Sequence, residues 1–185
     1  MFNFSLPKSS RVHTRRARLS LALIAVGIVA AGALVPAFVS SSANAATTGI
    51  FADDLKPKVS ADSDRVPVEL GIRFTPRVAG SVTGLQYYQG PKAKGVTTAT
   101  LWSSDGKVVA RQTFSTSSAV GWRTIPLAKP VKLTAGKTYT ASYQAPKGGY
   151  AVTERDLTSH RVQNGFALTP GAGVYRYGKT GKIPT

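Results

Sequence analysis

The stretch Val66-Pro67-Val68-Glu69-Leu70-Gly71-Ile72-Arg73-Phe74 decides the fold class of this chain. Its apolar side chains alternate with residues of other kinds, and this period of two is typical of a half-buried β-strand and fits helix spacing poorly. Pro67 has no amide hydrogen, so it limits the start of the strand to a sheet edge or a bulge. The sequence therefore predicts a strand at 66–74 with one face on a core.

Similar short strands follow along the chain. We expect them at 82–88, 98–102, 107–114, 122–127, 131–133, 137–144, 150–153 and 174–177, with a bulge at Gly84 and a hairpin turn at Asp105-Gly106. No stretch after residue 46 keeps a helical period for three turns. This pattern predicts an all-β fold, namely a single antiparallel β-sandwich of the jelly-roll kind with about eight or nine short strands.

The first 45 residues have the three parts of a secretory signal. Five basic residues precede an apolar stretch at 19–39, and Ala43-Asn44-Ala45 forms an A-x-A cleavage site. We therefore expect a signal helix within residues 1–45, cleavage near Ala45, and a secreted or cell-surface protein. The alternative is an uncleaved anchor, because about 20 apolar residues can span a bilayer. Arg15-Arg16 leaves the choice between the general and the twin-arginine export route open.

The rest of the chain is expected to be one basic domain. Residues 46–65 form a polar lead-in segment, and residues 66–185 form the β-sandwich domain. The chain has no Cys, so it has no disulfide and no thiolate site. Without the signal, 19 Lys and Arg stand against 8 Asp and Glu, a formal charge of +11. This charge is either an ordinary solvated surface or an attraction to anionic polymers, which alone carries no specificity.

Several motifs resemble one known family. They are Val68-Glu69-Leu70-Gly71-Ile72-Arg73-Phe74, Gly80-Ser81-Val82-Thr83-Gly84-Leu85, Ala99-Thr100-Leu101-Trp102, Gly121-Trp122, Thr134-Ala135-Gly136-Lys137-Thr138-Tyr139, Ala141-Ser142-Tyr143, Gly149-Tyr150 and Gly173-Val174-Tyr175-Arg176-Tyr177-Gly178. They make the chain similar, from about residue 50 onward, to a bacterial family known only as domain of unknown function 4082. The resemblance implies an exported protein, a jelly-roll-like β-sandwich and no assigned catalytic residues.

The resemblance departs from the family at the C-terminus. Family members usually continue after the Tyr-Arg-Tyr-Gly segment into a closing strand, whereas Thr185 follows soon after it here. Three alternatives stay open: another segment replaces that strand, a sheet edge is left open, or the gene is truncated. An open edge would invite pairing with a partner strand.

Catalytic chemistry finds little support in these residues. The only imidazole after the signal is His160, and Ser159, His160 and Asp156 are too close in sequence to be typical of a catalytic triad. A glycosidase needs two carboxylates that flank a cleft. The candidates are Glu69, Asp105, Glu154 and Asp156, and the turn already accounts for Asp105. We therefore expect no catalytic residues and no enzyme activity.

Aromatic residues make a better case for binding. Tyr87 and Tyr88 are adjacent, so on a regular strand they point to opposite faces and one of them is exposed. We expect Tyr88, with Gln86 and Gln89 beside it, to be the first ligand-binding candidate. Tyr150, after two glycines, is the second. Residues of these types are more often structural than functional.

Calcium is the one ion that the sequence leaves open. Asp62 and Asp64 could supply oxygen ligands, although their spacing is not that of an EF-hand and scattered acids in a polar segment are the simpler interpretation. Zinc is not expected with one His after the signal and no Cys. No other cofactor is expected.

The sequence predicts a non-catalytic extracellular binding module for a glycan or an anionic cell-wall polymer. The alternative is a structural or adhesive surface unit that assembles with other chains through an open sheet edge. The expected partner is a polysaccharide or wall polymer. No specific nucleic acid is expected, the membrane is met only through the signal peptide, and the oligomeric state stays open.

Overall fold

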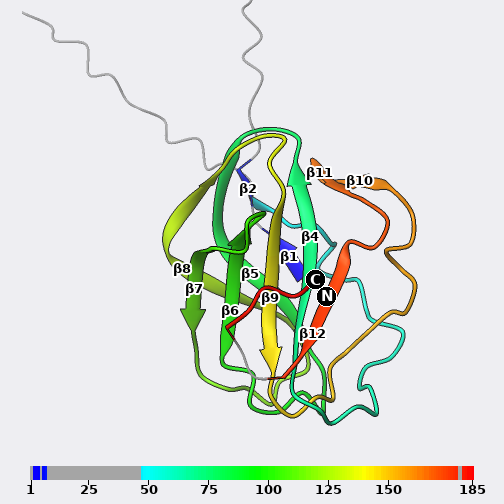
Figure 1. Ribbon diagram of the computed structural model, residues 1–185. Helices are drawn as coiled ribbons and strands as arrows, with labels where there is room; N and C mark the ends of the chain where they lie inside the picture. The colour runs from blue at the N-terminus through cyan, green and yellow to red at the C-terminus, as the bar shows by residue number, and fades with distance from the viewer. Residues whose placement is uncertain (1, 5, 8–46, 179–180) are drawn as a thin grey trace, which may run out of the picture. The chain divides into compact units, whose positions relative to one another are not determined.

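The structure, a computed structural model, describes residues 2–4, 6–7, 47–178 and 181–185 (Figure 1). This part of the chain contains no helix, and its paired strands all run antiparallel. The strands are β1 (Phe2–Phe4), β2 (Leu6–Pro7), β3 (Thr47–Thr48), β4 (Val68–Pro76), β5 (Gly80–Gln89), β6 (Thr98–Ser103), β7 (Val108–Thr113), β8 (Gly121–Leu133), β9 (Tyr139–Ala145), β10 (Arg161–Gln163), β11 (Phe166–Leu168) and β12 (Gly173–Tyr177). All of them belong to one compact unit.

The larger sheet is built around β4, the strand that the opening stretch forms. β4 pairs with β9 from Val68 opposite Ala145 to Phe74 opposite Tyr139. On its other side β4 pairs first with β12 and then with β11. β6 and β7 continue the sheet beyond β9. The predicted start at Val66 is wrong, because β4 begins only after Pro67 and the Val66 side chain is 52% exposed.

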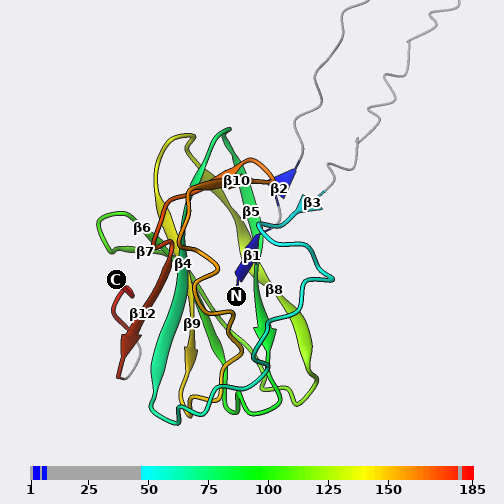
Figure 2. The ribbon, with the colours of Figure 1, turned by 90° about the vertical axis from the view of Figure 1, so that its right-hand side faces the viewer.

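The smaller sheet places β5 between β1 and β8. Figure 2 shows this sheet as a layer facing the larger one, so the fold is β-sandwich-like. The predicted bulge at Gly84 is confirmed, since the pairing of β5 with β8 shifts between Val82 and Gly84. The predicted strands at 122–127 and 131–133 are parts of the single strand β8.

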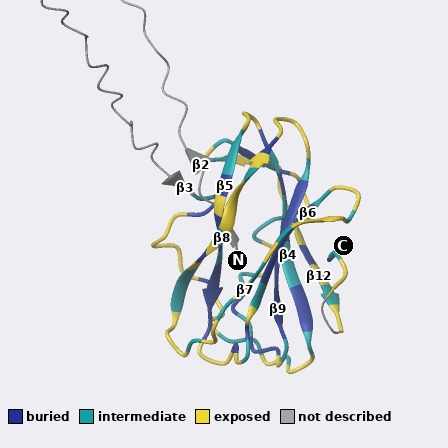
Figure 3. Ribbon diagram, turned by 90° about the vertical axis from the view of Figure 1, so that its left-hand side faces the viewer, coloured by how far each residue is buried: buried dark blue, intermediate teal, exposed yellow. Residues whose placement is uncertain are grey.

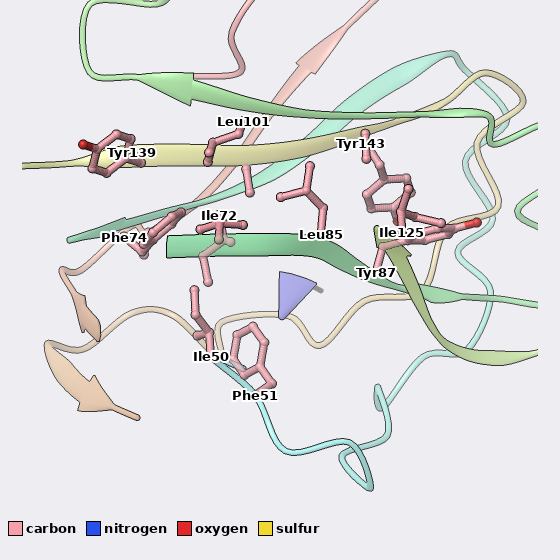
Figure 4. Close-up of a cluster of buried hydrophobic side chains, with 14 of the residues drawn as sticks. Ile50, Phe51, Ile72, Phe74, Leu85, Tyr87, Leu101, Ile125, Tyr139 and Tyr143 are labelled. Atoms are coloured by element: carbon pink, nitrogen blue, oxygen red, sulfur yellow. The ribbon is translucent and has the colours of Figure 1, made fainter. Parts of the chain in front are cut away.

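The core lies between the two sheets (Figures 3 and 4). Tyr87 of β5 stacks on Tyr143 of β9, with ring centroids 4.8 Å apart, and Leu85 and Leu101 are fully buried. Every residue of β9 is buried, because this central strand is covered on both faces. Each large apolar side chain buried in this way contributes about 1.5–3 kcal/mol to folding.

The lead-in segment takes part in the core, which its polar composition did not predict. Ile50 and Phe51 are buried, and the Phe51 ring stacks on Trp122 of β8 at 6.4 Å (Figure 4 labels both lead-in side chains). The Trp122 indole N–H donates a 2.8 Å hydrogen bond to the Leu55 carbonyl oxygen. The segment therefore contributes two side chains to the core and is held against Trp122 of the smaller sheet.

The C-terminal residues cross the outer face of the larger sheet (Figure 1). Pro184 is buried against Gly71 of β4, and the Ile183 carbonyl accepts a 2.9 Å hydrogen bond from Arg176 Nε. Within the described residues β12 pairs with β4 alone, so its other side is a sheet edge.

Two further sequence predictions concern the segment 150–153 and the signal helix. The predicted strand at 150–153 contributes a single bridge, Val59 to Val152, and β10 and β11 were not predicted. The predicted signal helix lies outside the described residues. No helix in the described part of the chain is long and apolar enough to cross a membrane.

Candidate functional site

A pocket of about 190 Å³ opens beside the edge strand β12. Its buried floor is apolar and includes Ile72 of β4, Tyr143 of β9 and Phe51 of the lead-in. β12 forms one wall and residues 150–157 form much of the other. An apolar cavity of about 150 Å³ accepts a benzene-sized molecule, so this pocket has room for one ring-sized group.

Two polar side chains stand among these apolar walls. Asp156 Oδ2 accepts a 2.9 Å hydrogen bond from Arg161 Nη2, and both side chains are about one-third exposed. The second oxygen, Asp156 Oδ1, has no hydrogen-bond partner among the described residues. Thr153 Oγ1 accepts from the Lys58 amide at 3.1 Å, which leaves its hydroxyl hydrogen for a ligand. The pocket therefore offers one charged acceptor and one donor.

Tyr150 and Tyr175 line the walls of the pocket, and Tyr177 packs on Tyr175 outside it. Tyr175 lines the pocket and is 59% exposed; Tyr177, two residues on, meets it edge-to-face at 5.7 Å. The Tyr177 hydroxyl donates a 2.8 Å hydrogen bond to Asp64. Burial, followed by the nearby carboxylate of Asp62, raises the pKa of Tyr150 well above its ordinary value, so the Tyr150 hydroxyl stays protonated.

Backbone hydrogen bonds hold the wall that carries Tyr150. The amides and carbonyls of Val59 and Val152 bond each other at 2.9 Å, and the Asp62 amide donates to the Tyr150 carbonyl at 2.7 Å. The preceding Gly149 has φ of +65°, and a Cβ there would lie 2.5 Å from the Lys92 carbonyl oxygen. Glycine is required at this position both by the backbone conformation and by the close approach.

Of the four predicted ligand-binding residues, Tyr150 alone lines the pocket. The expectation that Tyr88 is exposed is wrong: its side chain is 9% exposed and packs edge-to-face on Trp122 at 5.7 Å. The two adjacent tyrosines do point to opposite faces, but the outward one, Tyr88, packs against Trp122 of the neighbouring strand. Gln89 is buried as well, donating to the Ala93 carbonyl at 2.6 Å.

Gln86 lies apart from the pocket. Its Nε2 donates a 2.7 Å hydrogen bond to Thr124 Oγ1 on the neighbouring strand β8. No sequence pattern pointed to Phe51, and Asp156 was considered only as a catalytic candidate. Tyr175 and Tyr177 could have been found, because alternation within β12 places both on one face.

The residues considered for catalysis lie in different environments. Glu69 is buried on the outer face of the larger sheet, and burial raises the pKa of its carboxyl group. Asp105 lies in the hairpin turn, where the Ser103 hydroxyl and then Lys107 lower its pKa to about 2. Glu154, Ser159 and His160 are exposed. No hydrogen bond joins His160 to Ser159 or Asp156 in the described structure.

The side chains of the calcium candidates Asp62 and Asp64 accept hydrogen bonds from nearby backbone amides. Asp62 Oδ1 accepts from the Asp64 amide, and Asp64 Oδ1 accepts from the Val66 amide, both at 2.7 Å. The Val66 amide and then the Tyr177 hydroxyl hold the pKa of Asp64 below its ordinary value. Across the described side chains there is no group of three or more His, Cys, Asp or Glu that could hold a metal ion.

One end of the sandwich gathers basic side chains, and we call Arg77, Lys132 and Lys137 the cationic end. The Gly136 amide donates to the Pro76 carbonyl at 2.8 Å, so Arg77 and Lys137 leave adjacent turns. Lys132 lies opposite Ser81 where β8 pairs with β5, next to the same turns. All three are exposed, and none forms an ion pair within the described residues.

The two antiparallel sheets and the pocket at the β12 edge define a small β-sandwich-like domain. The chain belongs to the family described as Domain of unknown function (DUF4082), whose model matches residues 54–185. The predicted family membership is thereby confirmed. Neither the curated proteins nor the solved structures include a significant match to this chain.

Proposed function

We propose that this chain is a non-catalytic extracellular binding module whose pocket beside β12 holds one unit of a neutral glycan. The observation that carries the proposal is the combination, in one pocket, of the exposed Tyr175 ring with the unpartnered Asp156 Oδ1. A jelly-roll arrangement of the sheets and export by the N-terminal signal are part of the same proposal.

A sugar fits this combination because it has two kinds of surface. The C–H faces of a pyranose ring pack on aromatic rings, and its hydroxyl groups need hydrogen-bond partners. Tyr175 and Tyr150 supply rings, while Asp156 and Thr153 supply an acceptor and a donor. The Asp156 carboxylate disfavours an anionic sugar in the pocket, since like charges repel.

Anionic wall polymers are a second candidate ligand, favoured by the cationic end. Its three side chains have no acidic partner, whereas six of the chain's eight acidic residues lie in segments 53–64 and 154–156. A polyanion would therefore be attracted to the cationic end and away from the pocket.

The alternative function, assembly with other chains, is favoured by the edge of β12. This strand pairs on one side only within the described residues, and Tyr175 and Tyr177 are both more than half exposed on it. An exposed edge with apolar side chains is a template for an added strand. If the protein assembles through this edge, it should form oligomers in the absence of a glycan.

The test compares Tyr175→Ala with Tyr177→Ala in sedimentation with insoluble neutral polysaccharides. The two tyrosines are similarly exposed on one strand, but only Tyr175 lines the pocket. We expect Tyr175→Ala to abolish binding and Tyr177→Ala to retain it, with unchanged circular dichroism for both. Equal effects of the two variants, or oligomers in the absence of glycan, would favour the assembly function.

A further inference from the structure

We infer that the sugar held in the pocket carries a methyl-bearing substituent, such as an N-acetyl group or a 6-deoxy carbon. This inference rests on the proposed glycan-binding function and names the class of sugar. It follows from the contrast between the floor of the pocket and its polar side chains.

The aliphatic side chains of the pocket cannot form a hydrogen bond with a hydroxyl group. Leu70 and Ile72 of β4 and Leu157 in the wall opposite β12 contribute apolar side chains. A hydroxyl buried against such groups loses its water without a replacement, which is unfavourable. A methyl group gains from the same surroundings because its burial removes apolar area from water.

Two of the polar side chains that line the pocket come from one segment. Asp156 and Thr153 belong to residues 150–157, and both are only partly buried, whereas Ile72 of the floor is almost fully buried. A sugar with hydroxyls on one side and a methyl group on the other satisfies both parts at once. A sugar with hydroxyls all around leaves one of them against the floor.

The volume of the pocket and the charge of its side chains agree with this inference. About 190 Å³ exceeds the space of one benzene-sized ring, so a substituent can enter along with part of the sugar ring. Asp156 is paired with Arg161 by a 2.9 Å contact, so its orientation is fixed toward one side of the pocket. The ligand class is therefore neutral, ring-shaped and methylated.

The test uses matched pairs of sugars titrated into the purified protein by calorimetry. Chitotetraose and cellotetraose differ in the acetamido groups, and the chitosan tetramer keeps the nitrogen as an amino group but lacks the acetyl groups. L-Rhamnose and L-mannose differ in the 6-deoxy carbon. One methylene in an apolar pocket changes discrimination by about 10- to 200-fold. We expect at least a roughly tenfold preference for the methyl-bearing member of one pair.

A substitution in the pocket tests whether the preference for a methyl-bearing sugar arises there. Leu157→Asn keeps a side chain of similar size but adds polar atoms to the wall, so it should reduce the preference to less than about threefold while the circular dichroism stays unchanged. Thr158→Asn, one residue on and exposed, is the control and should keep the preference. Equal affinity within both pairs would overturn the inference and leave the glycan proposal intact. Binding to none of the five sugars would overturn both.

Discussion

The Ser142 hydroxyl donates a 2.5 Å hydrogen bond to Glu69 Oε1, joining neighbouring strands β9 and β4 on the outer face of the larger sheet. Both side chains are buried, with exposed fractions of 0% and 4%. The same Ser142 oxygen accepts a 2.7 Å hydrogen bond from the Trp102 indole N–H of β6. A chain of hydrogen bonds therefore runs across three adjacent strands and ends on an acid.

Glu69 should make the stability of the protein depend on pH in an unusual direction for an acid. Burial raises the pKa of its carboxyl group above 4.5, so the folded state binds the proton more tightly than the unfolded state. Its contribution is fully present below about pH 4.5 and is lost as the pH rises through the folded pKa. Glu69→Gln removes this titration and keeps an acceptor for Ser142.

The measurement is the free energy of urea unfolding of both proteins from pH 4.5 to 8. The wild type should lose stability relative to Glu69→Gln as the pH rises, because only the wild type must bury a charge. Asp64 and Asp105, whose pKa values are lowered, affect both proteins equally. A constant difference between the two proteins over this range would contradict the prediction.

Ser142→Ala should destabilise the fold more than removal of one exposed hydroxyl. The substitution leaves the Trp102 N–H and the Glu69 carboxylate without their shared partner in a buried site. An orphaned buried polar group costs about 1–3 kcal/mol. Thermal unfolding at pH 7 measures the loss, and Ser81→Ala, which removes a hydroxyl for which the described structure shows no hydrogen bond, should change stability by less than about 0.5 kcal/mol. Similar effects for the two serines would show that the hydrogen-bond chain is unimportant.

Gly149→Ala should be far more destabilising than Gly136→Ala, although both glycines have φ near +70°. The shared conformation costs about 1–2 kcal/mol for an alanine. At Gly149 the new Cβ also meets the Lys92 carbonyl oxygen at 2.5 Å, whereas at Gly136 nothing lies within 4 Å. Such overpacking adds about 1–3 kcal/mol. Chemical denaturation compares the two, and equal losses would mean that the loop moves aside without cost.

Reversing the charge of the three side chains in the cationic end should weaken binding to anionic polymers more than the same change in net charge made elsewhere. Arg77→Glu, Lys132→Glu and Lys137→Glu together alter the net charge as much as Lys92→Glu, Lys94→Glu and Lys147→Glu do in other exposed turns. We expect a roughly tenfold loss of affinity at low salt for the first triple and a much smaller loss for the second. Sedimentation with a soluble polyanion across a salt series measures both. Equal losses would assign the attraction to net charge alone.

The strands could be predicted where the sequence alternates strictly, as in Val68–Phe74, because the pleat imposes a period of two. β10 and β11 could not, since each has three residues and the pattern is too short to show a period. Tyr150 was found through its glycine neighbours, whereas the exposure of Tyr88 was predicted wrongly. The pleat fixes which face a side chain points to, but only side-chain packing fixes what covers it, which for Tyr88 is the Trp122 ring.

The position of the cationic end also bears on orientation. Arg77 and Lys137 lie in adjacent turns without acidic partners among the described residues, whereas most carboxylates lie in segments 53–64 and 154–156, so this arrangement would contribute to an electric dipole moment of the domain. A dipole turns in the field of a charged surface before contact is made. Near a polyanionic layer the domain would arrive with its basic turns first, and at physiological ionic strength screening would confine this orienting effect to a Debye length of about 8 Å from the layer.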